Sequence, residues 1–254
     1  MKHLTYCFSL LFMLFSCEPD KQVPEVRIPP FSGTIFIHSD IITPSDPTTF
    51  ETIEYGGQAS RTMFDRRVND WITVDAFLFV AAYDDGLTAE VQVNPEFGTK
   101  EAAEVEAGKY AEVIGRLPTA LRRDVETVWI HLGTNPFGGG NNNLLIHTGQ
   151  AAEYVRDGIL EETLVHEAAH TSLDADHASS SGWKMAQNKD NLFISTYARD
   201  NEEREDIAES FLPYFAIRYR AERIPDSLKE TIETSIPHRI SYFDAQAFDM
   251  YPIE

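Results

Sequence analysis

Cysteine is nearly absent from this chain of 254 residues. The two cysteines, Cys7 and Cys17, both lie close to the N-terminus. The rest of the chain has no thiol from which a disulfide bond could form, so its stability must come from the packing of apolar side chains. Hydrophobic residues make up 43% of the chain, which suffices for the core of one large domain or of two small lobes.

Positive charge is also scarce. Lys and Arg number 21 against 41 Asp and Glu, and the formal net charge is −20 at pH 7. The phosphate backbone repels such a chain, so we expect no nucleic-acid partner. We attribute the acidity to solubility rather than to a preference for basic substrates.

The apolar run at the N-terminus is too short to cross a bilayer. It extends from Leu4 to Phe15, follows Lys2 and ends at Ser16, whereas a spanning helix needs roughly 20 residues. A short basic start, an apolar run and a small residue are typical of an export signal. We therefore predict a signal peptide at residues 1–16 that is removed from the mature chain.

The residues around Cys17 carry a resemblance of their own. "LFSC" resembles the lipobox of bacterial lipoproteins. That resemblance implies that Cys17 is lipidated and anchors the exported protein to a bacterial membrane, in the periplasm or at the cell surface. The proline-rich residues 17–30 suit an extended tether.

Residues 31–254 are predicted to form the folded part, and no long linker divides them. Strand-like runs come first, at residues 31–39, 75–83 and 88–97, with a short helix expected over residues 61–72. Later segments extend this pattern: helix at 100–125 interrupted by Pro118, strands at 126–133 and 141–149 around a glycine-rich loop, and helices at 159–173, 186–199 and 201–223, before a tail that contains residues 225–236. Strands followed by helices predict an α+β fold.

The helix expected at 159–173 contains the strongest chemical motif, "HEAAH". His166 and His170 lie four positions apart, so both imidazoles can reach one ion from the same helix face. Glu167 lies about 100° around the helix axis, where it can take a proton from a metal-bound water. Asp157 is expected to cap this helix. A catalytic zinc needs a third protein ligand, which must come from elsewhere.

One candidate for the third ligand lies just downstream. In "HEAAHTSLDAD" Asp176 occupies the third-ligand position of the metzincin pattern HExxHxxGxxD. Leu173 stands where that pattern has a glycine, and leucine is poorly suited to the positive φ that such a turn requires. His177 falls one place late.

A second candidate is Glu205. Apolar residues from Ile207 to Tyr219 form a helical stripe, and Glu205 falls within its angular range. An unpaired buried carboxylate costs several kcal/mol, so it needs a partner such as a metal ion. Glu209, one turn further on, could accept a hydrogen bond from a ligating histidine. The alternative is that Glu205 only favours the start of the helix electrostatically.

"HEAAH" followed by "YAR" and "EDIAESF" resembles the gluzincin peptidases, in particular their lethal-factor-like branch. The resemblance covers roughly residues 120–215. It implies a zincin-like fold in which His166, His170 and Glu205 bind zinc, Glu167 is the general base, and Glu209 supports the site. Tyr197 matches the family's tyrosine that stabilises the tetrahedral intermediate, at an offset one residue longer than expected.

Another match competes within the same segment. "NEERED" fits the thermolysin pattern NExxxD, which would make Glu202 the ligand and Asp206 its helper. We favour Glu205 because the downstream "AESF" and the apolar stripe agree with it. If the family architecture holds, "NNNLLIHTG" is the edge strand that bonds an extended peptide. His147 on that strand is expected at the surface, and His38, His131 and His238 are expected to be structural or solvent-facing.

The leading hypothesis is a lipid-anchored zinc metallopeptidase that hydrolyses peptides or proteins by attack of zinc-activated water, with Tyr197 or His177 at the oxyanion. A non-catalytic surface module that binds zinc or a protein ligand on a peptidase-like scaffold is the alternative. The intact Glu167 argues against it, because a structural zinc site is closed by four protein ligands. Hydrolysis of another bond class would use the same chemistry, and nothing in the sequence predicts the oligomeric state.

Overall fold

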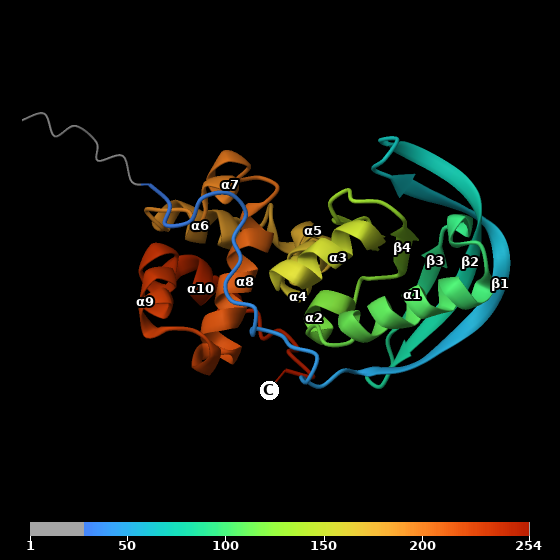
Figure 1. The fold of residues 1–254 in the computed structure, drawn as a ribbon. Helices are drawn as coiled ribbons and strands as arrows, with labels where there is room; N and C mark the ends of the chain where they lie inside the picture. The colour runs from blue at the N-terminus through green and yellow to red at the C-terminus, as the bar shows by residue number, and fades with distance from the viewer. Residues whose placement is uncertain (1–27, 254) are drawn as a thin grey trace, which may run out of the picture.

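The computed structural model describes residues 28–253. The predicted signal peptide, Cys17 and the tether up to residue 27 lie outside the described residues. The described chain combines one six-stranded sheet with helices that mostly follow it (Figure 1), in agreement with the predicted α+β class. In this part of the chain, no helix has both the length and the apolar character needed to span a membrane.

The sheet has the strand order β1-β2-β3-β4-β6-β5. Its strands are β1 (Phe50–Asp65), β2 (Asp70–Tyr83), β3 (Thr88–Val93), β4 (Thr127–His131), β5 (Gly138–Gly140) and β6 (Asn143–His147). Strands β1, β2 and β3 form an antiparallel meander, β3, β4 and β6 run parallel, and β5 returns antiparallel to β6. The short strand β5 therefore forms one edge of the sheet.

Helices occupy most of the chain after β3. They are α1 (Lys100–Ile114), α2 (Thr119–Arg122), α3 (Thr148–Asp157), α4 (Leu160–Ser172), α5 (Asp174–His177), α6 (Ser181–Lys189), α7 (Thr196–Asp200), α8 (Asp206–Tyr219), α9 (Asp226–Ser235) and α10 (Pro237–Asp244), with 3-10 turns η1 (Pro95–Phe97) and η2 (Ala221–Arg223). The predicted helices at 100–125 and 159–173 are confirmed. Asp157 is the last residue of α3, and the residue preceding α4 is Ile159.

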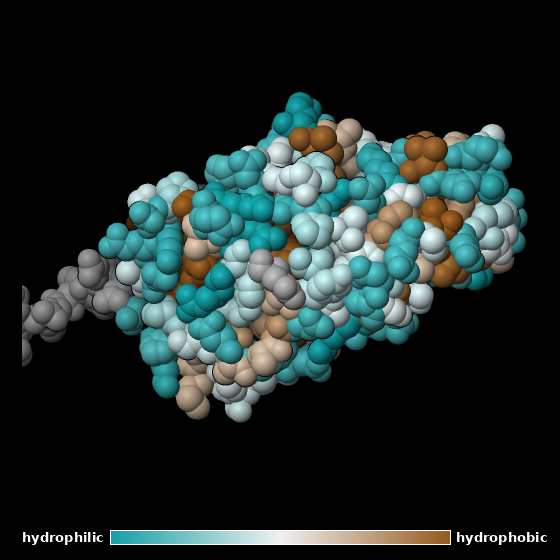
Figure 2. Space-filling model, turned by 90° about the horizontal axis from the view of Figure 1, so that it is seen from below, coloured by the Kyte–Doolittle hydropathy of each residue, from teal (hydrophilic) through white to brown (hydrophobic). Residues whose placement is uncertain are grey.

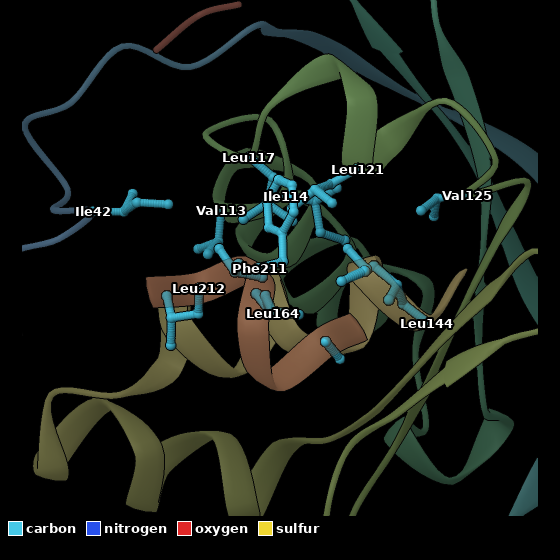
Figure 3. Packing of buried hydrophobic residues seen from close by; sticks show 14 of the residues in the cluster. Ile42, Val113, Ile114, Leu117, Leu121, Val125, Leu144, Leu164, Phe211 and Leu212 are labelled. Atoms are coloured by element: carbon cyan, nitrogen blue, oxygen red, sulfur yellow. The ribbon is translucent and has the colours of Figure 1, made fainter. Parts of the chain in front are cut away.

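The main core fixes the position of α4. Figure 3 shows side chains from α1, α4, α8 and β6 meeting there, among them Ile114, Leu164, Phe211 and Leu144. Each of these four residues is at most 1% exposed. Helix α4 buries most of its residues, because the sheet and α2 lie on one side and α8 on the other. Its partly buried residues, among them Glu167 and His170, are therefore held in a single orientation.

The helix predicted at residues 61–72 is wrong. These residues form the end of β1, a turn and the start of β2, with Met63 opposite Ile72 in the register. Met63 is fully buried, whereas Thr62 is exposed and Phe64 is only partly buried, the alternation expected of a strand with one covered face. Asn69, at φ 53°, supplies the left-handed backbone conformation of the turn.

The strand predicted at residues 31–39 is also absent from the sheet. This segment, which we call the N-terminal strap, runs in extended form along the helical part of the molecule (Figure 1). Its amides bond to helix carboxylates: Ile37 and His38 donate to Glu162 at 2.9 and 2.7 Å, and Ile35 donates to Glu209 at 3.1 Å. Side chains thus satisfy the backbone groups that a neighbouring strand would otherwise satisfy.

Replacing Glu162 by Gln is expected to lower the free energy of unfolding by about 2 kcal/mol. Both carboxylate oxygens accept backbone N–H groups, and an amide offers only one acceptor and places an N–H against the other donor. Denaturant unfolding measures the change. The exposed Glu230→Gln on α9 is the control, and equal stability of the two variants would contradict this anchoring role.

The helix predicted at 186–199 is broken. Helix α6 ends before Asp190, whose carboxylate accepts the backbone amides of His238 and Arg239 at the start of α10, at 2.8 and 3.0 Å. The chain resumes as α7 at Thr196. The face seen in Figure 2 is largely hydrophilic with scattered apolar residues, as the acidic composition implies.

Candidate metal centre

His166 and His170 lie one turn apart on α4, and their Nε2 atoms are 3.1 Å from each other. The four-residue spacing places both imidazoles on one face of α4, where His166 is 8% exposed and His170 is partly buried. Their rings meet nearly edge to face, with centroids 4.8 Å apart. Two nitrogen donors therefore converge on one point.

Glu205 brings the third donor. It immediately precedes α8, is only 3% exposed, and makes no capping hydrogen bond with its side chain. Its Oε2 atom lies 3.1 Å from Nε2 of His170 and 3.4 Å from Nε2 of His166. The carboxylate is therefore directed to the two histidines, not to the start of the helix.

The three donor atoms fit a zinc ion. Zinc binds imidazole nitrogen and carboxylate oxygen at about 2.0–2.2 Å in a tetrahedron, which places neighbouring ligand atoms about 3.3 Å apart. The observed separations of 3.1, 3.1 and 3.4 Å match this value. Within residues 28–253, no other group of three histidine, cysteine or acidic side chains is close enough to hold an ion.

Each histidine has an acidic partner on its other nitrogen. Nδ1 of His170 lies 2.7 Å from Oδ2 of Asp174, and Nδ1 of His166 lies 3.6 Å from Oε1 of Glu209. The other oxygen of Glu209 accepts the Ser195 hydroxyl. Such carboxylates orient ligating imidazoles and increase their basicity. Glu209 thus lies where the supporting role expected of it requires, and Asp174 occupies the equivalent position beside His170.

The charges around the site favour a cation. Burial alone would lower the pKa of His170, but its hydrogen bonds to Asp174 and Glu205 outweigh burial and raise that pKa to about 10. Burial opposes ionisation of Glu205 as well, and its bonds to His166 and His170 still depress its pKa far below the usual range. The carboxylates that raise the pKa of His170 would likewise attract a metal cation to the same place.

The alternative ligand Asp176 lies elsewhere. It accepts a hydrogen bond from Arg123 at 2.8 Å and is largely exposed. His177 is paired with the Tyr242 hydroxyl at 2.7 Å. Leu173 is buried, and the chain continues from it into α5 without the return turn of the metzincin pattern. Neither Asp176 nor His177 borders the cleft at the histidines.

The thermolysin-type alternative does not meet the histidines either. Glu202 is exposed in the turn before α8 and does not border the cleft. Asp206 is fully buried and pairs with Arg239 at 2.9 Å. This ion pair joins α8 to α10 and serves packing. Of the acids considered for the third position, Glu205 is the one brought to His166 and His170.

The donor cluster opens into a cleft of about 650 Å³. Glu167 and Tyr197 border it, as do Thr34 and Phe36 of the N-terminal strap. Burial raises the pKa of Tyr197, and the nearby carboxylate of Glu205 raises it further. Both residues expected to take part in catalysis thus lie beside the donors.

The edge strand predicted at residues 141–149 is wrong in position. Strand β6 covers Asn143–His147 and is paired on both sides, by β4 and β5. The edge is β5, from the segment expected to be a glycine-rich loop. A Cβ atom on Gly139 would lie 1.9 Å from the carbonyl oxygen of Glu167. The glycine therefore allows the edge strand to rest directly on the metal-site helix.

Replacing Gly139 by Ala is expected to push β5 away from α4, lower the free energy of unfolding by about 3 kcal/mol, and weaken zinc binding. The contact is between two backbones, so neither side can yield by a rotamer change. Gly108→Ala on α1, where a Cβ would meet only an Ile53 methyl at 3.9 Å, is the control and should not destabilise. Equal unfolding midpoints would contradict the close approach.

His147 was expected at the surface and is fully buried. It stacks on His131, with ring centroids 5.5 Å apart, and its Nε2 lies 3.7 Å from Oδ1 of Asp65. Both histidines end parallel strands and pack beneath the β1–β2 turn. Burial lowers the pKa of both, to about 4 for His131. They form a structural pair outside the cleft.

Two cleft residues have no motif in the sequence. Tyr154 on α3 borders the cleft, and burial raises its pKa. Arg66 reaches the cleft from the β1–β2 turn, a segment predicted to be helical. Its place depends on the packing of the β1–β2 turn against Gly138 of β5, a contact between segments far apart in the sequence.

Comparisons of the chain with protein-family models, with curated proteins and with solved structures found no match.

Proposed function

We propose that this chain is a zinc-dependent metallopeptidase with a zincin-like domain. The observation that carries the proposal is the triangle formed by His166, His170 and Glu205, with sides that suit one tetrahedral ion. A closed structural site would have a fourth protein ligand. Here the triangle faces a cleft bordered by Glu167, so a fourth position is available to solvent and substrate.

Each residue would have a defined task. Zinc, when bound, would polarise the scissile carbonyl and lower the pKa of water to about 7. Glu167 would take the proton of the attacking water and deliver it to the departing amine. Tyr197, which borders the cleft, would donate to the oxygen of the former carbonyl. Asp174 and Glu209 would hold the two imidazoles in their ligating orientation.

The walls of the cleft support an extended peptide as the substrate. Strand β5 is an edge of the sheet, and an edge can add a further strand through backbone hydrogen bonds. Thr34 and Phe36 of the strap form part of the cleft wall. We also propose that lipid on Cys17 attaches the exported protein to a bacterial membrane, which would place the cleft near substrates outside the cytoplasm.

Metal removal tests the proposal. We expect the purified chain to cleave casein or a peptide mixture, to lose the activity in a chelator, and to regain it with one equivalent of zinc. Mass spectrometry of the products identifies the cleaved bonds. Zinc binding without any cleavage would favour the non-catalytic surface module, and activity that persists in the chelator would contradict zinc catalysis.

A further inference from the structure

Among the residues that the structure describes, Arg66 has no acidic partner. Every other arginine of residues 28–253 has a carboxylate oxygen within 4.0 Å of its guanidinium nitrogens. No carboxylate oxygen of residues 28–253 lies within 4.0 Å of the guanidinium nitrogens of Arg66. In a protein with 41 acids against 21 bases, an unpaired guanidinium is unexpected. Its positive charge is available to a ligand.

The turn that carries Arg66 is rigidly held by its neighbours. Asp65 is 3% exposed and accepts the backbone amide of Arg67 at 2.9 Å and its guanidinium at 2.7 Å. Arg67 also donates to Glu96 at 2.7 Å. These bonds tie the turn to the sheet and leave the side chain of Arg66 uncommitted.

Arg66 lies over the edge strand. A Cβ atom on Gly138 would be 2.9 Å from its Nη2 atom, so the guanidinium rests against the glycine backbone of β5. Arg66 borders the same cleft as His166 and Glu167. A peptide that runs along β5 toward the metal centre would therefore pass this cation.

The other cleft guanidinium is not equivalent. Arg204 forms an ion pair with the carboxylate of Glu205 at 3.4 Å, which partly neutralises the positive charge of Arg204. Glu167 and Glu203 also border the cleft and repel a second carboxylate. Attraction for an anionic group is thus concentrated at Arg66.

We propose that Arg66 binds a carboxylate of the substrate and so selects acidic peptides. The inference rests on the proposed peptidase function. A guanidinium can form two parallel charge-assisted hydrogen bonds to a carboxylate, which an amide of the same shape cannot match. The carboxylate can be an Asp or Glu side chain or the C-terminus of the peptide, and both present the same group.

Binding tests the proposal without requiring turnover. Zinc-loaded Glu167→Gln protein is incubated with N-acetylated random hexapeptides, in one pool with free and in another with amidated C-termini, and retained peptides are sequenced by mass spectrometry. Acidic side chains enriched in both pools identify the side-chain carboxylate. Retention confined to the free pool identifies the C-terminus.

Adding the substitution Arg66→Gln to the Glu167→Gln protein is expected to reduce the enrichment of carboxylate-bearing peptides roughly tenfold or more. Adding Arg66→Glu should instead enrich peptides that contain Lys or Arg. Arg156 is an exposed arginine on α3 outside the cleft, so Arg156→Gln is the control and should leave the enrichment unchanged. Three results would overturn the proposal: no retention, retention of both pools without a preference for acidic side chains, or a preference for acidic side chains or for the free C-terminus that survives Arg66→Gln. An intact acidic preference in a wild-type protein that cleaves nothing would instead reject the peptidase function alone.

Discussion

Replacing Glu167 by Gln is expected to lower kcat for peptide hydrolysis by about a thousandfold while one zinc ion per chain remains bound. Glu167 follows the ligand His166 on α4 and borders the cleft without belonging to the donor triangle. The amide keeps the shape and the hydrogen-bonding reach of the side chain but cannot accept the proton of the attacking water. Catalysis should therefore fail without loss of the metal.

Turnover and zinc content are measured on the same samples. Glu161→Gln is the matched control, because Glu161 lies on the same helix but does not border the cleft. It should retain both activity and zinc. Turnover of the Glu167 variant within a few-fold of the wild type would remove the proposed mechanism, even if zinc is present.

Replacing Glu205 by Ala is expected to weaken zinc binding by at least about a hundredfold and to abolish hydrolysis with it. The variant loses the one carboxylate of the triangle, whose oxygen lies 3.1 and 3.4 Å from the two imidazole nitrogens. Two histidines alone hold zinc weakly. Competition titration with a zinc-binding dye measures the affinity, and thermal unfolding checks that the variant is folded.

Glu202→Ala is the control for this substitution. Glu202 is an exposed acid three residues earlier, in the same turn before α8. It should bind zinc as the wild type does. The opposite outcome, with zinc lost in Glu202→Ala and retained in Glu205→Ala, would restore the thermolysin-type ligand set and would contradict the geometry described above.

The elements around the metal centre could be predicted because their sequence patterns are local. Four-residue spacing of His166 and His170 within an apolar run predicts a helix with both rings on one face, and α4 has this form. The apolar stripe after Glu205 predicts a buried helix, and α8 is buried along nearly its whole length. The meeting of the two segments followed from the need of a buried carboxylate for a partner.

The walls of the cleft could not be predicted in this way. Strand β5 consists of three glycines and has no side-chain alternation to reveal it. The N-terminal strap has a strand-like sequence, but carboxylates more than a hundred positions away satisfy its amides. His147 is buried because the distant β1–β2 turn covers it. In each case the conformation depends on a contact between residues that are far apart in the sequence.

Diffraction at the zinc absorption edge tests the central claim most directly. Crystals of the chain grown with one equivalent of zinc should give one strong anomalous peak, about 2.0–2.2 Å from Nε2 of His166, Nε2 of His170 and a carboxylate oxygen of Glu205. A peak coordinated by other side chains, or no peak while these three residues keep their places, would contradict the account.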